Sequence, residues 1–171
     1  MCPDSKTLTI RPTTMADFGA VDALLARSYP VLLKADYKPS VMVTALPMIS
    51  KAQSRLLRCG TYFLAEDEAG QVLAAGGWTR TGPGGRGGRP SVGHIRHVVT
   101  DHRATRQGIG RALMEHVLGS ARAAGVETLD CLSTLTAVPF YGAMGFQTIG
   151  AVELSLAPGI RFPAVQMERR L

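Results

Sequence analysis

The chain of 171 residues has few of the features that mark secreted, membrane-bound or metal-dependent proteins. Its only cysteines are Cys2, Cys59 and Cys131, an odd number whose spacing matches neither a disulfide framework nor a zinc site. No run reaches the roughly 18 to 20 apolar residues that a membrane-spanning helix needs. The apolar core of a secretory signal is missing from the first residues, MCPDSKTLTIRPT. We therefore expect a cytoplasmic protein with no membrane association and no metal.

Acidic residues are in the minority, with 13 Asp and Glu against 19 Lys and Arg, and the formal net charge is +6. Such a balance suits nucleic acid or a phosphate-rich cofactor, and it also arises where arginine codons are favoured. The arginines are scattered along the chain, and Arg86 and Arg89 in a glycine-rich loop have no interleaved aromatic residues that would stack on bases. The pattern argues against nucleic acid as a partner.

Length and periodicity predict a single domain over residues 1–171 with an α/β fold. The expected strands are Thr7–Arg11, Thr61–Ala65, Gln71–Thr79, Val92–Thr100, Thr128–Ser133, Phe146–Leu156 and Ala164–Glu168. The expected helices are one capped by Thr14, one over Ser40–Arg58 that Pro47 breaks or kinks, Gly108–Ala124 and Val138–Met144. This order implies a mixed central sheet of about seven strands flanked by helices.

One turn between a strand and an amphipathic helix carries the strongest chemical signal, and it reads Thr105-Arg106-Gln107-Gly108-Ile109-Gly110-Arg111-Ala112. Its two glycines leave backbone N–H groups uncovered, and the first turn of a helix has unpaired donors and about half a positive charge. A phosphate suits that array, with Arg106 and Arg111 adding charge at the rim. The residues alone leave open that Gly108 and Gly110 only permit tight helix–sheet packing.

A dinucleotide-binding turn fits this segment less well. Leu113 stands where the third glycine of G-x-G-x-x-G belongs, and residues 101–107 separate the strand from the first glycine. A literal G-x-G-x-x-G does occur at Gly82, Gly84 and Gly87, but a strand follows it instead of a helix. We interpret that segment as a flexible loop.

Two segments together resemble the GNAT N-acetyltransferase superfamily. The cofactor motif of that superfamily, Q/R-x-x-G-x-G/A after a strand, is similar to HIRHVVTDHRATRQGIGRALMEHV, and its downstream A-x-x-F-Y-x-x-x-G-F is similar to AVPFYGAMGF. The two segments at this spacing are more specific than either alone. The likeness extends over most of the chain, although the first 60 residues match only by the order of elements.

The resemblance implies a mostly antiparallel sheet that splays between its fourth and fifth strands, with acetyl-CoA in the wedge. The pantetheine arm would pair with the backbone of Val98, Val99 and Thr100, and the pyrophosphate would bind the amides from Arg106 through Ala112. The usual Gln or Arg of the motif is Thr105 here. Many relatives have an asparagine that contacts the cofactor at the position of Thr134, whose hydroxyl can still donate a hydrogen bond.

Tyr141 matches the tyrosine that the resemblance implies as general acid for the sulfur of CoA. A phenol with a pKa near 10 is protonated at neutral pH and can donate to a thiolate. Taken alone, Tyr141 reads equally as an aromatic core residue, like Phe140 and Phe146.

The resemblance assigns the base less firmly. In the histone-modifying branch a base glutamate lies six residues before the position that matches Thr100, which here is His94. Imidazole is a competent base near neutrality, although a hydrogen-bonded strand histidine or an ordered water chain are alternatives. Strand alternation places two sets of side chains on opposite faces, the first being His94, Arg96, Val98 and Thr100 and the second Ile95, His97 and Val99. His94 and His97 are therefore not expected to bind one metal.

The resemblance implies transfer of an acetyl group from acetyl-CoA to a primary amine by direct attack in a ternary complex. Cys131 has no histidine near it in sequence, which argues against a covalent route. The alternative function is a catalytically silent CoA-binding sensor or interaction module. The acceptor, a small molecule or a peptide, is not identified by the sequence, and a homodimer is compatible with the resemblance.

Overall fold

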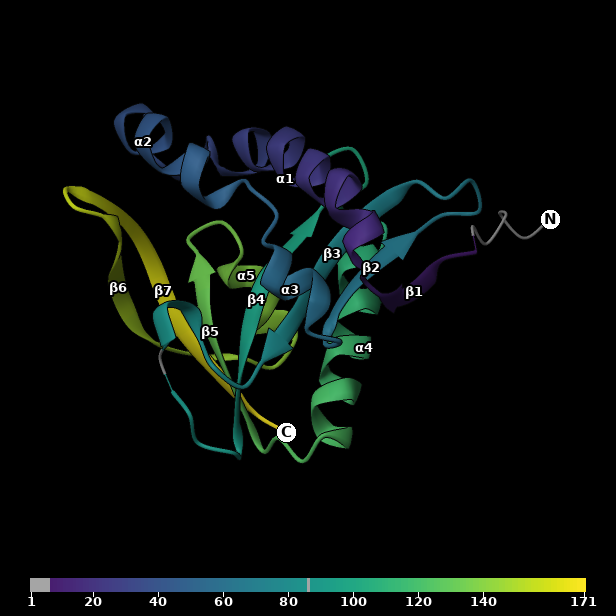
Figure 1. The fold of residues 1–171 in the computed structure, drawn as a ribbon. Helices are drawn as coiled ribbons and strands as arrows, with labels where there is room; N and C mark the ends of the chain where they lie inside the picture. The colour runs from purple at the N-terminus through teal and green to yellow at the C-terminus, as the bar shows by residue number, and fades with distance from the viewer. Residues whose placement is uncertain (1–6, 86) are drawn as a thin grey trace.

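The computed structural model describes residues 7–85 and 87–171, so Cys2 and Arg86 lie outside the described residues. A seven-stranded sheet in the order β1-β2-β3-β4-β5-β7-β6 forms its centre (Figure 1). The strands are β1 Thr9–Pro12, β2 Tyr62–Glu66, β3 Val72–Thr79, β4 Val92–Thr100, β5 Thr128–Thr134, β6 Gln147–Ala157 and β7 Ile160–Arg170. All neighbouring strands are antiparallel except β4 and β5. The predicted α/β class and the mixed, mostly antiparallel sheet are confirmed.

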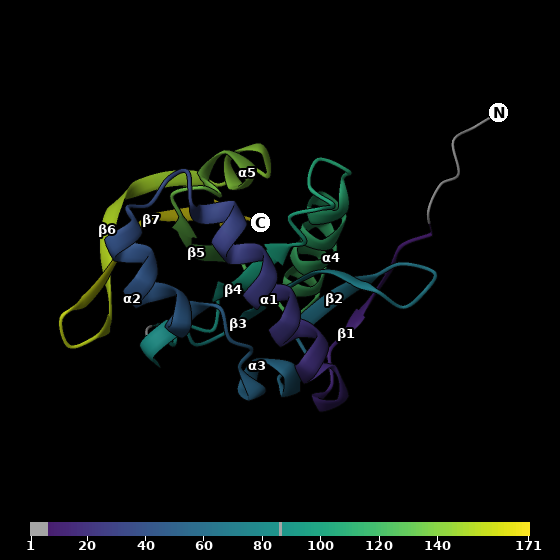
Figure 2. The same ribbon diagram turned by 90° about the horizontal axis from the view of Figure 1, so that it is seen from above.

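Helices cover both faces of the sheet (Figure 2). They are α1 Phe18–Leu33, α2 Pro39–Ile49, α3 Ser54–Arg58, α4 Ile109–Ala123 and α5 Val138–Ala143. The first three lie on one face, and α4 and α5 lie on the other. Across the described ranges, none of the helices combines the length and apolar character needed to cross a membrane.

Local sequence signals explain where the helices begin and end. The carboxylate of Asp17 accepts the backbone N–H of Thr14 at 2.8 Å, as the capping-box spacing predicts. The break expected within Ser40–Arg58 occurs, but α2 continues through Pro47 and ends at Ile49. The region therefore forms two helices, α2 and α3, and α2 ends two residues after Pro47.

Each face of the sheet buries its own apolar core. The α4 face packs Leu113, Met114 and Val117 against Trp78 and Leu129. The opposite face packs α1, α2 and α3 onto the sheet through a second cluster, which includes Leu24, Leu25, Leu57, Tyr62 and Leu64. On the helices, apolar residues spaced three and four positions apart form the surface that packs on each face of the sheet.

The parallel pair at the centre of the sheet is short. β4 and β5 are bonded only from Val92 to His94, opposite Thr128 to Asp130. Beyond His94 the edge of β4 that faces β5 has no strand partner among the described residues, while β3 continues to pair with the other edge as far as Thr100. The predicted splay between the fourth and fifth strands is present.

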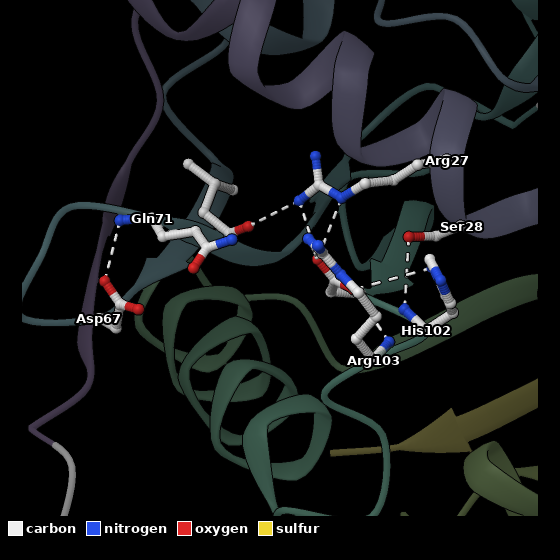
Figure 3. A network of polar contacts seen from close by, with 8 residues as sticks. Arg27, Ser28, Asp67, Gln71, His102 and Arg103 are labelled. Carbon is white, nitrogen blue, oxygen red and sulfur yellow. Dashed lines mark hydrogen bonds and ion pairs between the residues drawn. The ribbon is translucent and has the colours of Figure 1, made fainter.

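A network of polar contacts that includes Arg27 and Arg103 lies at the end of β4 (Figure 3). Asp101 is 1% exposed, and its side chain accepts hydrogen bonds from Arg27 at 2.9 Å and from Arg103 at 2.9 Å. Hydrogen bonds from Arg103 and then Arg27 hold the pKa of this carboxyl well below its usual range. The backbone N–H of Asp101 also donates to the Leu73 carbonyl at 2.7 Å. These bonds tie α1 and β3 to the start of the turn before α4.

We predict that Asp101→Asn lowers the free energy of unfolding by about 2 kcal/mol, because Arg27 then keeps a half-buried charge without its anion. Urea denaturation measures this loss. Arg161→Gln is the matched control, because its pair with Glu153 is exposed on both sides and contributes less than about 0.5 kcal/mol. Equal losses for the two variants would contradict the structural role of Asp101.

Candidate active site

The turn before α4 presents a set of free backbone donors. Arg106 and Gly108 both have positive φ angles, 64° and 76°, and Gly108 is the N-cap of α4. The first helical bond runs from the Ala112 N–H to the Gly108 carbonyl at 3.0 Å. The amides of residues 108–111 therefore have no acceptor within the helix. The amide of Ala112, which we expected to bind phosphate, is used by the helix itself, so the free donors end at Arg111.

The two glycines of the turn serve different needs. Gly108 adopts a left-handed conformation that costs other residues strain, and a Cβ there would meet open space. A Cβ at Gly110 would instead lie 3.0 Å from Thr100 Oγ1 and 3.3 Å from the Phe140 ring. Gly110 is therefore required for close packing against β4 and α5, and Gly108 is required for the left-handed backbone conformation.

The turn is open to solvent on its β1 side. A cleft of about 730 Å³ lies there, lined by Gln107, Gly108 and Ile109 from the turn and by Leu73 and Arg103. On its other side, Gly110 adjoins the end of β4 and α5 through Thr100 and Phe140. The structure thus brings the free amides next to the unpaired edge of β4 that ends in Val98, Val99 and Thr100.

A β-bulge interrupts β4 at His97. Its φ is 45°, and the register with β3 shifts, since Arg96 pairs with Gly77 whereas Val99 pairs with Ala75. The bulge inserts one extra residue and turns the strand. The His97 carbonyl accepts a hydrogen bond at 2.9 Å from the hydroxyl of Tyr62, whose side chain is buried. Tyr62 therefore holds the bulge from β2.

The bulge overturns the predicted alternation of β4. The ring of His97 reaches Gln53, in the segment between α2 and α3, with 3.2 Å between the two Nε2 atoms. Ile95 and Val98 instead pack into the α4 core. The prediction that Ile95 and His97 share a face is wrong, because the extra residue moves Arg96 and His97 to the same face. His94 and His97 consequently lie on one face, that of α1, α2 and α3.

Tyr141 lies at the wall of the splay. Its side chain is buried, and its ring makes edge contacts with Phe140 at 5.3 Å and Phe146 at 5.4 Å between centroids. Burial raises the pKa of Tyr141 well above its usual value, and the neighbouring Cys131 and Tyr29 raise it further. Tyr141 is protonated at neutral pH.

His94 lies deeper, at the last bonded position of β4 and β5. It is 6% exposed, and its Nδ1 lies 3.5 Å from Asp130 Oδ2. A Cβ at Gly82 or Gly87 would overlap its ring, so the glycine-rich loop packs directly on His94. Two glycines of the apparent dinucleotide motif, Gly82 and Gly87, thus have a packing role, whereas Gly84 has a positive φ and no such contact. The loop covers the residue that the sequence predicts as the base.

Two further candidates have defined surroundings. Thr134 accepts the backbone N–H of Ala137 at 3.2 Å, which leaves its hydroxyl proton available as a donor. Cys131 is buried, and burial raises the pKa of its thiol to about 12, so it is not a thiolate at neutral pH. Within residues 7–85 and 87–171, no group of three or more His, Cys, Asp or Glu side chains could hold a metal ion.

The sequence did not predict that residues 34–38, between α1 and α2, form a strap across the splay. The Tyr37 hydroxyl donates to the Pro163 carbonyl at 2.7 Å and accepts the Leu135 N–H at 2.8 Å. Asp36 accepts the hydroxyl of Thr136 at 2.7 Å. These bonds tie the segment between α1 and α2 to β7 and to the β5–α5 connection. No local pattern announces such contacts, because their partners lie about a hundred residues away.

Comparison with known proteins now decides the family. Residues 34–171 match the sequence model of the acetyltransferase (GNAT) domain. The chain belongs to the GNAT acetyltransferases. Membership makes it an acetyl-CoA-dependent acetyltransferase. Among curated proteins, no sequence matches it significantly.

Solved structures share the whole fold. A GCN5-related N-acetyltransferase from Rhodopseudomonas palustris has a TM-score of 0.76 at 19% identity, over 100% of this chain and 99% of its own. The PaiA N-acetyltransferase from Thermoplasma acidophilum, in complex with coenzyme A, has a TM-score of 0.72 at 11% identity, over 96% and 99%. N-acetylglutamate synthase from Neisseria gonorrhoeae, with coenzyme A and N-acetyl-glutamate, has a TM-score of 0.65 at 18% identity, over 98% and 36%. At these identities the likeness is one of fold.

We predict that Gly108→Ala raises the dissociation constant for CoA about tenfold, because a Cβ at positive φ costs roughly 1 kcal/mol or more and distorts the free amides. Isothermal titration calorimetry measures the change. Gly119→Ala is the control, since Gly119 lies inside α4 and a Cβ there meets nothing within 4 Å. It should stabilise the helix by about 0.5–1 kcal/mol and leave CoA binding unchanged. Wild-type affinity in Gly108→Ala would remove the turn from the binding site.

Proposed function

We propose that this acetyltransferase transfers the acetyl group of acetyl-CoA to a primary amine by direct attack in a ternary complex. The observation that carries the proposal is the splay, where an unpaired edge of β4 lies beside free helix-start amides and a protonated phenol. A thioester placed in this gap is accessible from both faces of the sheet. Direct transfer needs such access, because the amine must reach the thioester while CoA remains bound.

The co-substrate would be held mainly by backbone groups. The pantetheine arm would extend along Val98, Val99 and Thr100, whose edge has no strand partner in the described sheet. The pyrophosphate would bind the amides from Gly108 through Arg111, where the helix dipole favours an anion. Arg106 and Arg111 add charge, Gln107 is a further donor at the rim, and Thr134 offers its hydroxyl from the far side. The turn therefore needs no side chain at Thr105 to hold phosphate.

Tyr141 supplies the proton in this proposal. The bound co-substrate provides a thioester whose departing sulfur becomes a thiolate. A phenol that stays protonated in an apolar surrounding can donate to that thiolate without competition from water. The base that the sequence suggests, His94, lies beneath the glycine-rich loop and beside Asp130. An ordered water chain or the residues at the bulge are the alternatives to it.

We also propose a cytoplasmic location. Of the described cysteines, Cys59 is exposed and Cys131 is buried, and both are free thiols. Free thiols persist in a reducing compartment.

We predict that Tyr141→Phe lowers kcat about a hundredfold and leaves the dissociation constant for acetyl-CoA within about twofold, because the lost proton donor acts only during transfer. Purified protein is assayed for release of CoA with L-glutamate, n-butylamine, putrescine and a lysine-containing peptide. Tyr29→Phe removes a buried phenol from α1 and serves as the control, with kcat close to wild type. Binding of acetyl-CoA without transfer to any of the amines would favour the silent CoA-binding module instead.

A further inference from the structure

The bulge of β4 holds two polar side chains in an unusual state. His97 keeps a positive φ of 45° although it is not glycine, and such strain persists only where neighbouring groups impose it. Tyr62 fixes its carbonyl and Gln53 lies against its ring. Strained residues of this kind concentrate at functional sites.

Arg96 has no carboxylate partner in the described part of the chain. Its Nη1 donates to Thr79 Oγ1 at 3.1 Å and to the Thr81 carbonyl at 3.2 Å, both of which are neutral. In contrast to Arg96, four arginines of the described residues have a carboxylate oxygen within 3.3 Å of a guanidinium nitrogen; they are Arg11, Arg27, Arg103 and Arg161. The half-buried guanidinium of Arg96 thus retains N–H donors in a fork that fits a carboxylate.

Because the guanidinium of Arg96 is half-buried, its charge is destabilised when no anion lies beside it. Burial lowers the pKa of Arg96, which shows that the charged form is desolvated. Charges removed from water are stable when an opposite charge accompanies them. A carboxylate from a ligand would meet that need.

His97 offers an unused nitrogen beside Arg96. Its Nδ1 has no contact with solvent and no hydrogen-bond partner within the described residues. The atoms in contact are the two Nε2 atoms, and an amide nitrogen only donates, so in this orientation His97 Nε2 accepts. With the Gln53 amide turned by 180°, its oxygen accepts a proton from Nε2 and the lone pair lies on Nδ1. Burial, and then the charge of Arg96, lower the pKa of His97 to about 4, so the imidazole is neutral at physiological pH.

The bulge lies where an acceptor would have to enter. β4 and β5 separate after His94, and His97 immediately precedes the edge assigned to pantetheine. The turn proposed to receive phosphate begins α4, which lies on the sheet face opposite α1, α2 and α3 (Figure 2). The register of β4 and the contact of His97 with Gln53 place Arg96 and His97 on the face of α1, α2 and α3. Co-substrate and acceptor can therefore meet in the splay from opposite faces.

We propose that the bulge is the acceptor subsite, that it takes an amine bearing a carboxylate, and that Arg96 binds this carboxylate while His97 receives the amine proton. The inference rests on the proposed function. The unprotonated amine attacks the thioester carbonyl, so a C–N bond forms and the C–S bond breaks. The nitrogen's proton passes to His97 Nδ1, and the thiolate takes the proton of Tyr141. Once the product has left, water that enters the splay returns a proton to Tyr141 and removes one from His97.

Acceptors that differ by one carboxylate test the role of Arg96. The pairs are L-norvaline with n-butylamine and L-phenylalanine with phenethylamine. The wild-type enzyme should give kcat/KM at least about tenfold higher for the amino acid of each pair, as a charge-assisted bond implies. Arg96→Gln should raise KM for the amino acids until this preference disappears, and should leave n-butylamine unaffected.

Arg80→Gln is the matched control for Arg96. Arg80 also donates only to neutral oxygens among the described groups, the carbonyls of Pro90 and Ala124, and its loss removes the same charge. The preference for amino acids should survive in this variant. Equal rates for both members of each pair in wild type, or loss of the preference in Arg80→Gln as well, would overturn the carboxylate assignment.

His97→Asn tests the base, because asparagine tolerates positive φ and keeps a polar side chain. We expect kcat to fall about a hundredfold for both members of each pair, with KM for the amino acids and binding of acetyl-CoA unchanged. His116→Asn, which changes an exposed histidine of α4, should retain wild-type kcat. Wild-type kcat in His97→Asn would remove His97 from the proton transfer.

If no amine is acetylated, binding of L-norvaline to the enzyme tests the subsite. Enzyme saturated with CoA is then titrated with L-norvaline in a calorimeter. Binding by wild type and its loss in Arg96→Gln would support the subsite although the proposed function had failed. Absence of binding to wild type, or equal binding to both proteins, would overturn it.

Discussion

The hydrogen bonds between β4 and β5 stop at His94, although both strands continue, and the proposed active site depends on this separation. An unpaired strand edge inside a folded sheet is costly unless another group bonds to it. Here it lies next to a helix start that also has free donors. One extended ligand with amide groups and phosphates meets both needs at once.

Several contacts position the elements around this gap. Asp101 anchors the end of β4 to α1 through Arg27, which fixes where the turn before α4 begins (Figure 3). Tyr37 ties the segment after α1 to β7 across the open end. Tyr62 maintains the bulge from β2. The site is therefore supported by hydrogen bonds between parts of the chain that are distant in sequence, and its flanking cores supply the rigidity.

Much of the fold followed from the sequence, because apolar periodicity and glycine positions are local signals. These signals predicted the order of elements and the amphipathic α4, and β7 differs mainly in being longer than Ala164–Glu168. The splay was expected only from the resemblance to the GNAT superfamily. The bulge was not predicted, because alternation assumes a regular strand. The adjacent glycines of β3, Gly76 and Gly77, were the available signal for it, because the register with β4 shifts between Ala75 and Gly77. The cover over His94 and the strap at Tyr37 arise from tertiary contacts, which spacing along the chain does not encode.

A crystal structure of the chain with CoA tests the central claim most directly. We expect the pyrophosphate within hydrogen-bond distance of the amides of residues 108–111. We also expect the pantetheine along Val98 to Thr100, and the sulfur close to the hydroxyl of Tyr141. CoA bound in the cleft beside Leu73 and Arg103, with β4 and β5 still separated and empty, would contradict it.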